Sequence, residues 1–162
     1  MKTTHPTWTI VKVSALAAVL SAYSLPVLAG ENLWSSAGGQ GVYEYRASNL
    51  SGDTLAINNG ASAELDRAEP CWLSLETSKI RLPKTIQISI RVGRQVSIFN
   101  LASGETNFST KTEREQLFSL VNALTSTKAS SFRVEIPSLH TSVILPTANA
   151  KEALTDALDG CS

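Results

Sequence analysis

Apolar and polar side chains alternate around residues 86–98, and this pattern restricts the fold more than any other stretch of the chain. Strict alternation is the period of a half-buried strand. The apolar positions are Ile86, Ile88, Ile90, Val92, Val96 and Ile98, and Gly93-Arg94 stands between the two runs. A two-residue Gly-X loop between alternating runs is typical of a type II′ turn. The chain therefore contains an antiparallel β-hairpin.

The same period of two indicates further short strands on both sides of the hairpin. They are expected over residues 42–46, 54–57, 71–77, 132–136 and 142–145. Proline follows each of the last two and ends it. Residues 30–41 are rich in glycine and serine, and we expect them to form a loose lead-in held by Trp34.

Two segments have helical spacing instead. Apolar residues over 117–124 cover one side of a helix of about four turns, with a capping box at Thr110/Glu113 or at Thr112/Glu115. A second helix is expected from Thr147 or Asn149, as N-cap, to Gly160 at the C′ position. Its inward positions are Ala150, Ala153, Leu154, Ala157 and Leu158. This order predicts an α+β fold: an antiparallel, β-rich sandwich or open barrel with two helices.

The N-terminus resembles a bacterial export signal. A basic lead with Lys2 and Lys12 precedes an apolar stretch that is too short to span a bilayer, and Val27-Leu28-Ala29 suits a signal peptidase. We expect residues 1–29 to be a signal peptide and residues 30–162 to be a single domain. An uncleaved N-terminal anchor is the alternative.

Both cysteines, Cys71 and Cys161, lie in the mature part. Two thiols in an exported chain predict one disulfide. Closing a loop of about 90 residues is worth up to about 4.6 kcal/mol in the chain-entropy model. Two free thiols or a pair of metal ligands are the alternatives. Because His140 is the only imidazole of the mature chain, a metal site lacks ligands, and we expect no metal or cofactor.

Charge excludes some partners. The first 29 residues hold two of the 14 basic residues and none of the 14 acidic ones, so the mature chain carries a formal charge of −2. That balance gives no electrostatic footprint for nucleic acid or for an anionic membrane. No second apolar span follows, so we expect no stable membrane insertion of the mature chain.

The catalytic inventory is small. His140 with Ser138 or Ser142 would make a hydrolase only in a constellation with an orienting carboxylate, and we favour a solvated loop histidine. Glu64, Asp66 and Glu69 could supply paired carboxylates for glycoside hydrolysis, but they lie in a charged run, and such a run is usually solvated. No catalytic residue is predicted.

Three aromatic residues are candidates for a recognition surface. Tyr43 and Tyr45 share one face of their strand, and tyrosines side by side on a strand form binding surfaces or close a core edge. Trp72 lies on the opposite face of its strand from Cys71. Packing in the core is the expectation for Trp72, with an exposed recognition role as the alternative.

The layout of residues 71–161 resembles the small secreted proteins around invasion-associated locus B. The shared features are an export leader, Cys71-Trp72-Leu73 opening a strand, the hairpin, a helix with strands, and Ala153-Leu154 before the closing Cys161. The resemblance implies a β-rich protein of Gram-negative bacteria, linked to virulence or host contact and without an assigned enzymatic activity. No functional residue is carried over from it.

We therefore expect a periplasmic or secreted, non-enzymatic domain that binds a protein at the bacterial envelope. An inhibitor or immunity protein that neutralises an envelope-targeting toxin or hydrolase is an alternative within that class. A small hydrolase that uses His140 is the alternative from another class.

Overall fold

Nine strands join into one sheet in the computed structural model, which describes residues 32–39, 42–60, 71–108, 110–159 and 161. The strands are β1 (Trp34–Gly39), β2 (Val42–Ser48), β3 (Thr54–Gly60), β4 (Cys71–Glu76), β5 (Thr85–Val92), β6 (Gln95–Ala102), β7 (Glu105–Asn107), β8 (Ser131–Ile136) and β9 (Thr141–Pro146). Their order in the sheet is β1-β2-β3-β4-β7-β6-β5-β8-β9, with antiparallel neighbours throughout. The predicted α+β, β-rich class is confirmed.

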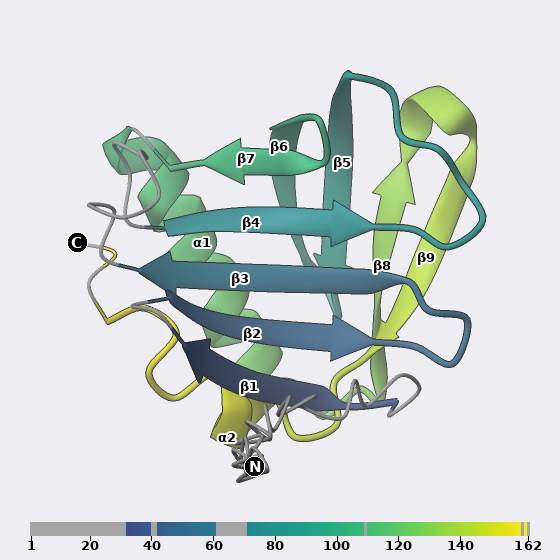
Figure 1. Cartoon of the computed structure of the whole chain (residues 1–162). Coiled ribbons are helices and arrows are strands. Elements are labelled where there is room, and N and C mark those ends of the chain that lie inside the picture. The colour runs from purple at the N-terminus through teal and green to yellow at the C-terminus, as the bar shows by residue number, and fades with distance from the viewer. Residues whose placement is uncertain (1–31, 40–41, 61–70, 109, 160, 162) are drawn as a thin grey trace, which may run out of the picture.

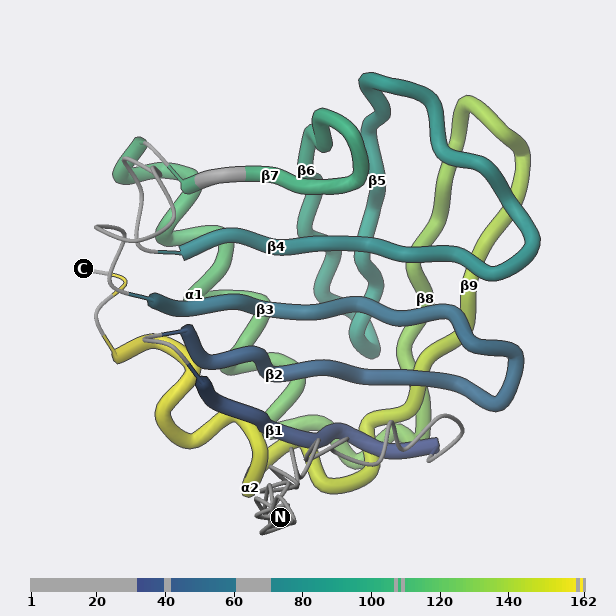
Figure 2. Tube along the Cα trace, viewed as in Figure 1, coloured from purple at the N-terminus to yellow at the C-terminus, as the bar shows by residue number. Residues whose placement is uncertain are grey.

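The sheet bends sharply at β7. In Figure 1, strands β1–β4 and β7 form one layer, and β5, β6, β8 and β9 run across it behind, with α1 (Lys111–Ser126) behind β1–β4. Strand β7 pairs with β4 over three residues but with β6 only through Ala102 and Glu105. The described parts of β1 and β9 do not pair, although Figure 2 shows the ends of the sheet approaching each other. The sheet is therefore an open barrel.

The core lies on the inner face of this sheet, where α1 covers it. The alternating residues of β5 are buried as predicted, and α1 contributes Leu117, Leu120, Val121 and Leu124. The apolar positions expected on β6 are a correction: Val96 and Ile98 are exposed, whereas Ser97, Phe99 and Leu101 are buried because they lie opposite Ile90, Ile88 and Ile86. The helix begins with the capping box at Thr110 and Glu113 rather than with the alternative pair two residues later. The alternating residues of β5 and the helically spaced residues of α1 therefore lie on opposite sides of one core.

Turn chemistry explains how the strands connect. Gly93 has φ of 59° and Arg94 is not among the residues with positive φ, which is the type II′ pattern predicted for the β5–β6 turn. Ser103 and Gly104 both have positive φ, 54° and 85°. This is the type I′ pattern, and it starts β7, a three-residue strand too short to show a period in the sequence.

The lead-in over residues 30–41 is a correction, because its residues 34–39 form strand β1. Strand β1 pairs in continuous register with β2, from Trp34 opposite Ala47 to Gly39 opposite Val42. Trp34 is completely buried and stacks on Phe132, with ring centroids 6.1 Å apart. Small residues hide the strand period, so pairing with β2 and one tryptophan anchor decide the conformation here.

The second helix is shorter than expected. Helix α2 spans Ala150–Ala153, and the chain then continues in tight turns to residue 159. Backbone bonds from Ala157 to Leu154 and from Cys161 to Leu158 have the i→i+3 spacing of such turns. The predicted inward residues are nevertheless buried, Leu158 only partly, and Gly160 lies outside the described residues.

The predicted disulfide joins Cys71, the first residue of β4, to Cys161. Their Cα atoms are 5.5 Å apart, and both residues are buried. The bridge thereby ties the segment after α2 to the start of β4 in the front layer. Within the described ranges, the helices are all too short or too polar to traverse a lipid bilayer.

Candidate functional site

Tyr43 and Tyr45 line a cleft between the front layer and the terminal segment of the chain. Register places Tyr45 between Ser36 of β1 and Ile57 of β3, and Tyr43 between Gly38 and Asn59. The cleft has a volume of about 520 Å³. Its other wall is formed by α2 and the turns that follow, which Figure 1 shows beside β1. The two tyrosines of the predicted recognition surface are therefore brought together.

The tyrosines differ in exposure. Tyr43 is 57% exposed, whereas Tyr45 is only 6% exposed. Tyr43 lies across Gly38: a Cβ atom at position 38 would come within 2.7 Å of the tyrosine ring atoms Cδ1 and Cε1. Glycine at this position thus gives the ring of Tyr43 its place at the mouth of the cleft.

The terminal segment makes the cleft acidic. Glu152, Asp156 and Asp159 contribute to the lining, which includes no lysine, arginine or histidine among the described residues. The pKa of the Tyr45 phenol is raised above its ordinary value by burial and then by the negative charges of Asp156 and Asp159, with a smaller contribution from Tyr43. Tyr45 therefore keeps its proton at neutral pH and can donate a hydrogen bond.

The Tyr45 hydroxyl makes no hydrogen bond to any residue that the structure describes. A phenol that lines a cleft and lacks a protein partner is open to a ligand or to water. This property distinguishes Tyr45 from a tyrosine that only fills a core.

Two links hold the acidic wall in place, that is, the segment from α2 onward with Glu152, Asp156 and Asp159. The side-chain amide of Asn59 donates a hydrogen bond to the backbone carbonyl of Asp159. Asn59 also lies opposite Cys71 in the register of β3 and β4, so the hydrogen bond and the Cys71–Cys161 disulfide are adjacent. The bridge therefore stabilises one wall of the cleft in addition to the fold.

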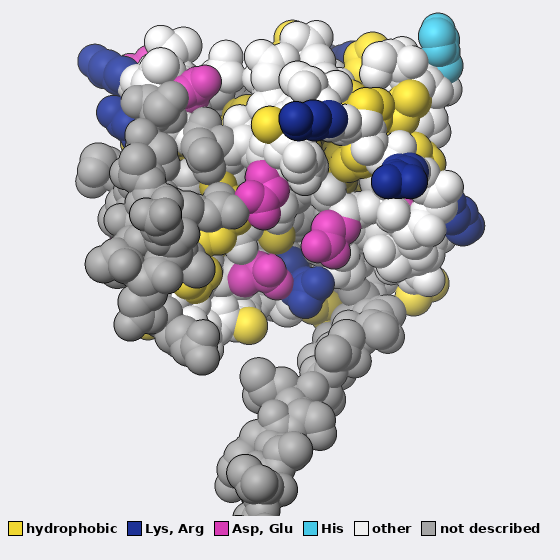
Figure 3. Space-filling view, turned by 45° about the horizontal axis from the view of Figure 1, so that its top comes forward, with side chains coloured by type: hydrophobic (Ala, Val, Ile, Leu, Met, Phe, Trp, Pro, Cys, Tyr) yellow, Lys and Arg dark blue, Asp and Glu magenta, His cyan; other side chains and the backbone are white. Residues whose placement is uncertain are grey.

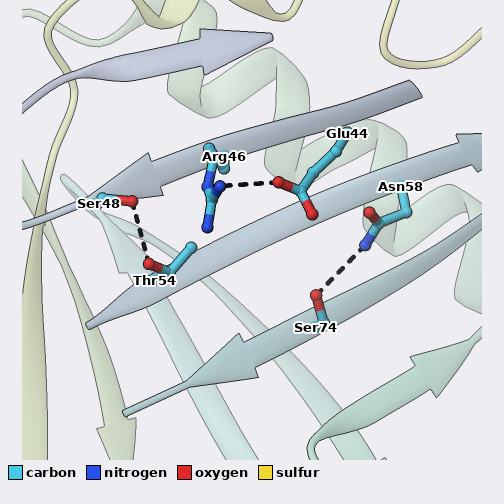
Figure 4. Close-up of polar contacts among 6 residues, drawn as sticks. All are labelled: Glu44, Arg46, Ser48, Thr54, Asn58 and Ser74. Atoms are coloured by element: carbon cyan, nitrogen blue, oxygen red, sulfur yellow. Dashed lines mark hydrogen bonds and ion pairs between the residues drawn. The ribbon is translucent and has the colours of Figure 1, made fainter. Parts of the chain in front are cut away.

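A second polar surface lies on the outer face of the same strands. In Figure 4, Glu44 approaches Arg46, Ser48 meets Thr54, and Asn58 points to Ser74. The ion pair between Arg46 Nε and Glu44 Oε1 is 3.3 Å long, and Asn58 Nδ2 donates to Ser74 Oγ over 3.3 Å. Figure 3 shows acidic side chains around a basic one on this face.

These outer polar groups mostly bond to one another. A hollow of about 340 Å³ lies beside them, lined also by Trp72, Glu76 and Glu105. Trp72 is 7% exposed, and its register with Asn58 places it on the outer face. The sheet therefore separates Trp72 from Tyr43 and Tyr45, and the three candidates do not form one surface.

The histidine of the hydrolase hypothesis lies elsewhere. His140 is exposed in the turn between β8 and β9, with φ of 49°. Ser138 is exposed beside it, and the Ser142 hydroxyl accepts a hydrogen bond from Arg133 Nη1 at 3.4 Å. Within the described chain, no residue hydrogen-bonds to the imidazole, so the geometry that a His–Ser pair requires is not assembled there.

Glu64, Asp66 and Glu69 lie outside the described residues. Among those described, no group of three or more histidine, cysteine, aspartate or glutamate residues has the arrangement of a metal site.

Sequence reasoning missed the acidic wall. Glu152, Asp156 and Asp159 alternate with the buried residues of the terminal segment, and this outward charge was the available signal. It does not say which strands the wall faces, since that depends on the disulfide and on strand β1.

Comparison with protein-family models, with curated protein sequences and with solved structures found no match for this chain. The likeness to the invasion-associated locus B proteins stays a prediction.

Proposed function

We propose that the mature chain is an exported, non-enzymatic domain that binds a protein partner in the periplasm or outside a Gram-negative cell. The observation that carries this proposal is the cleft of Tyr43 and Tyr45 beside the acidic terminal segment. It combines an exposed ring, a buried phenol without a hydrogen-bond partner among the described residues, and three carboxylates. Tyrosine is enriched in protein interfaces because it offers a large apolar area and a polar tip.

The rigidity of the site supports binding. Both tyrosines stand on β2, which is paired on both sides, and the opposite wall is held by the disulfide. A preorganised site loses less conformational entropy when a partner binds. The predicted leader and the disulfide favour an oxidising compartment for this encounter, and the resemblance to secreted proteins favours virulence or host contact as its setting.

Photo-crosslinking from the cleft tests the proposal. We would place p-benzoylphenylalanine at position 43, and as a control at position 98, where Ile98 of β6 is 49% exposed on the other half of the sheet. In envelope extract and culture medium we expect a stoichiometric protein adduct from position 43 and not from position 98. Equal labelling from both positions, or none from position 43, contradicts the proposal.

The identity of the adduct then refines the function. If the captured protein is a toxin or a hydrolase and its activity falls when it is bound, the domain is an inhibitor or immunity protein. Mass spectrometry of the exported protein checks the compartment, because we expect cleavage after Ala29 and the loss of two hydrogens at Cys71 and Cys161.

A further inference from the structure

Strand β1 is an edge of the sheet, and its outward backbone groups can be identified. The N–H of Trp34 donates to the carbonyl of Ala148 over 2.8 Å, and Asn149 Nδ2 donates to the carbonyl of Trp34 over 3.1 Å. Both backbone groups of Trp34 therefore point away from β2. Because backbone direction alternates along an antiparallel strand, Ser36 and Gly38 direct their N–H and C=O groups the same way.

Beyond Trp34 this edge has no partner among the described residues. No backbone hydrogen bond joins Ser36 or Gly38 to a described residue on that side. Residues 35–39 include no charged residue and no proline, and their pairing with β2 contains no bulge. Such features normally protect an edge against a further strand, so this edge is suited to strand addition.

The free edge and the cleft are one site. Ser36 and Gly38 line the cleft together with Tyr43 and Tyr45. A strand added beside β1 would project every second side chain onto the inner face, which is the face that carries both tyrosines. Those side chains would enter the space between the tyrosines and the acidic wall.

The chemistry of that space selects a cation. Three carboxylates contribute to its lining, and the exposed ring of Tyr43 offers a π face. Carboxylates bind ammonium and guanidinium groups through charge-assisted hydrogen bonds, and aromatic faces attract the same cations. Independently of this charge, the nine-tenths buried Tyr45 supplies a hydroxyl that no described residue binds.

We propose that the cleft binds a lysine or arginine side chain of an extended partner segment that adds as a strand to the free edge of β1. This inference rests on the proposed function and names the chemistry of the partner. Two basic residues separated by one position would both reach the cleft, because they share a face of the added strand.

A short peptide tests the inference on the mature, disulfide-bonded domain. The probe is acetyl-Thr-Arg-Thr-Lys-Thr-amide, and its control is the same peptide with glutamine in both basic positions. We expect saturable perturbation of the Ser36 and Gly38 amides and of the Tyr45 ring in NMR spectra with the basic peptide. Binding of the glutamine peptide should be at least about tenfold weaker.

Variants of the acidic wall separate charge from shape. We expect the double variant E152Q/D156N to weaken binding of the basic peptide by about tenfold or more. Both residues are exposed, so the fold should persist. The matched control is Glu76→Gln, which removes an exposed carboxylate from the outer face and should leave the affinity unchanged.

Strand addition has its own control in the peptide. A probe with N-methyl groups at the backbone nitrogens that would face β1 keeps its charge but cannot donate to the edge, and its affinity should fall. The variant Ser36→Pro removes the outward donor at residue 36, and proline is tolerated at such edge positions. If Ser36→Pro lowers the thermal stability, the N-methyl probe decides the question alone.

The outcomes separate this inference from the proposed function. Equal binding of the basic and glutamine peptides, or perturbations confined to the outer face, would overturn the inference, whereas a crosslinked partner at position 43 would still support a binding domain. Self-association of the domain alone that is lost in E152Q/D156N would assign the cleft to a second copy and also overturn it. If the basic peptide does not bind and position 43 gives no adduct, both the inference and the proposed function are contradicted.

Discussion

At the scale of single residues, Tyr45 is the most sensitive reporter of the cleft. It is 6% exposed, and its pKa is raised by burial and by the charges of Asp156 and Asp159. The predicted mature chain has only two tyrosines, since Tyr23 lies in the leader. An ultraviolet titration of tyrosine ionisation therefore reports only Tyr43 and Tyr45, both of which line the cleft.

We predict that Asp156→Asn lowers the pKa of Tyr45 toward its ordinary value of about 10. Part of the increase remains, because burial is its largest cause. Spectrophotometric titration checks this, with Tyr45→Phe to assign the signal and Glu76→Gln as the matched control. An unchanged pKa in Asp156→Asn would place that carboxylate away from the phenol.

Asp53 gives a second prediction at this scale. Burial raises the pKa of its carboxyl group, but hydrogen bonds from Asn49 and from the Ser78 backbone and hydroxyl, with the charge of Lys79, more than offset this, and the net pKa is lowered. Two of these bonds measure 3.0 Å from Asn49 Nδ2 and 2.9 Å from the Ser78 N–H.

A lowered folded pKa contributes stability above the unfolded value of about 3.9, and the contribution is lost as pH falls through the folded pKa. We expect Asp53→Asn to be less stable than the parent at pH 7 by about 1 kcal/mol. The difference should shrink as the pH falls below about 4. Urea unfolding at several pH values measures it, and a difference independent of pH would contradict the assignment.

At the scale of elements, the start of α1 has a matched pair of threonines. Thr110 Oγ1 accepts from the Glu113 N–H at 3.2 Å, and Glu113 Oε2 accepts from the Thr110 N–H at 2.9 Å. We predict that Thr110→Ala lowers the free energy of unfolding by about 1 kcal/mol. Thr112→Ala, inside the first turn, should be neutral or slightly stabilising because alanine is the better helix former. Equal losses in chemical denaturation would exclude the capping box as the cause.

The same elements show what was predictable from sequence. The β5–β6 hairpin, α1 and its cap rest on local signals, namely a period of two, a Gly-X turn and Thr-x-x-Glu, and these elements are confirmed. The inner face of β6 was not predicted, because Val96 and Ile98 are exposed. Strand β1 was missed because Ser35 to Gly39 have no apolar period, and a strand of small residues is decided by its neighbour.

The cleft could be predicted only in part, for a related reason. Tyr43 and Tyr45 share a face by strand alternation alone, so their pairing followed from sequence. The acidic wall reaches them through contacts about 100 residues apart in the chain, such as Asn59 with Asp159. Strand alternation places Trp72 on the opposite face from Cys71, but it does not say which of the two faces is the inner one. The register of the bent sheet decides that, and Trp72 lies on the outer face.

At the scale of the whole molecule, the disulfide connects stability with the site. It closes a separation of 90 residues and lies next to the Asn59–Asp159 hydrogen bond. We predict that replacing Cys71 and Cys161 together with alanine lowers the free energy of unfolding by up to about 4.6 kcal/mol. The pKa of Tyr45 should fall in the same variant, because the acidic wall loses its anchor. Denaturant unfolding and tyrosine titration check the two effects, and an unchanged pKa would show that the wall holds without the bridge.

Competition at position 43 tests the central claim most directly. The crosslinker at that position is allowed to react with the partner in the presence of increasing acetyl-Thr-Arg-Thr-Lys-Thr-amide, and the glutamine peptide serves as the control. The account predicts that the adduct decreases as the basic peptide saturates the domain and persists with the control peptide. An adduct that persists at saturation would contradict a basic partner segment in the cleft, and equal adducts from positions 43 and 98 would contradict a protein-binding cleft at these tyrosines.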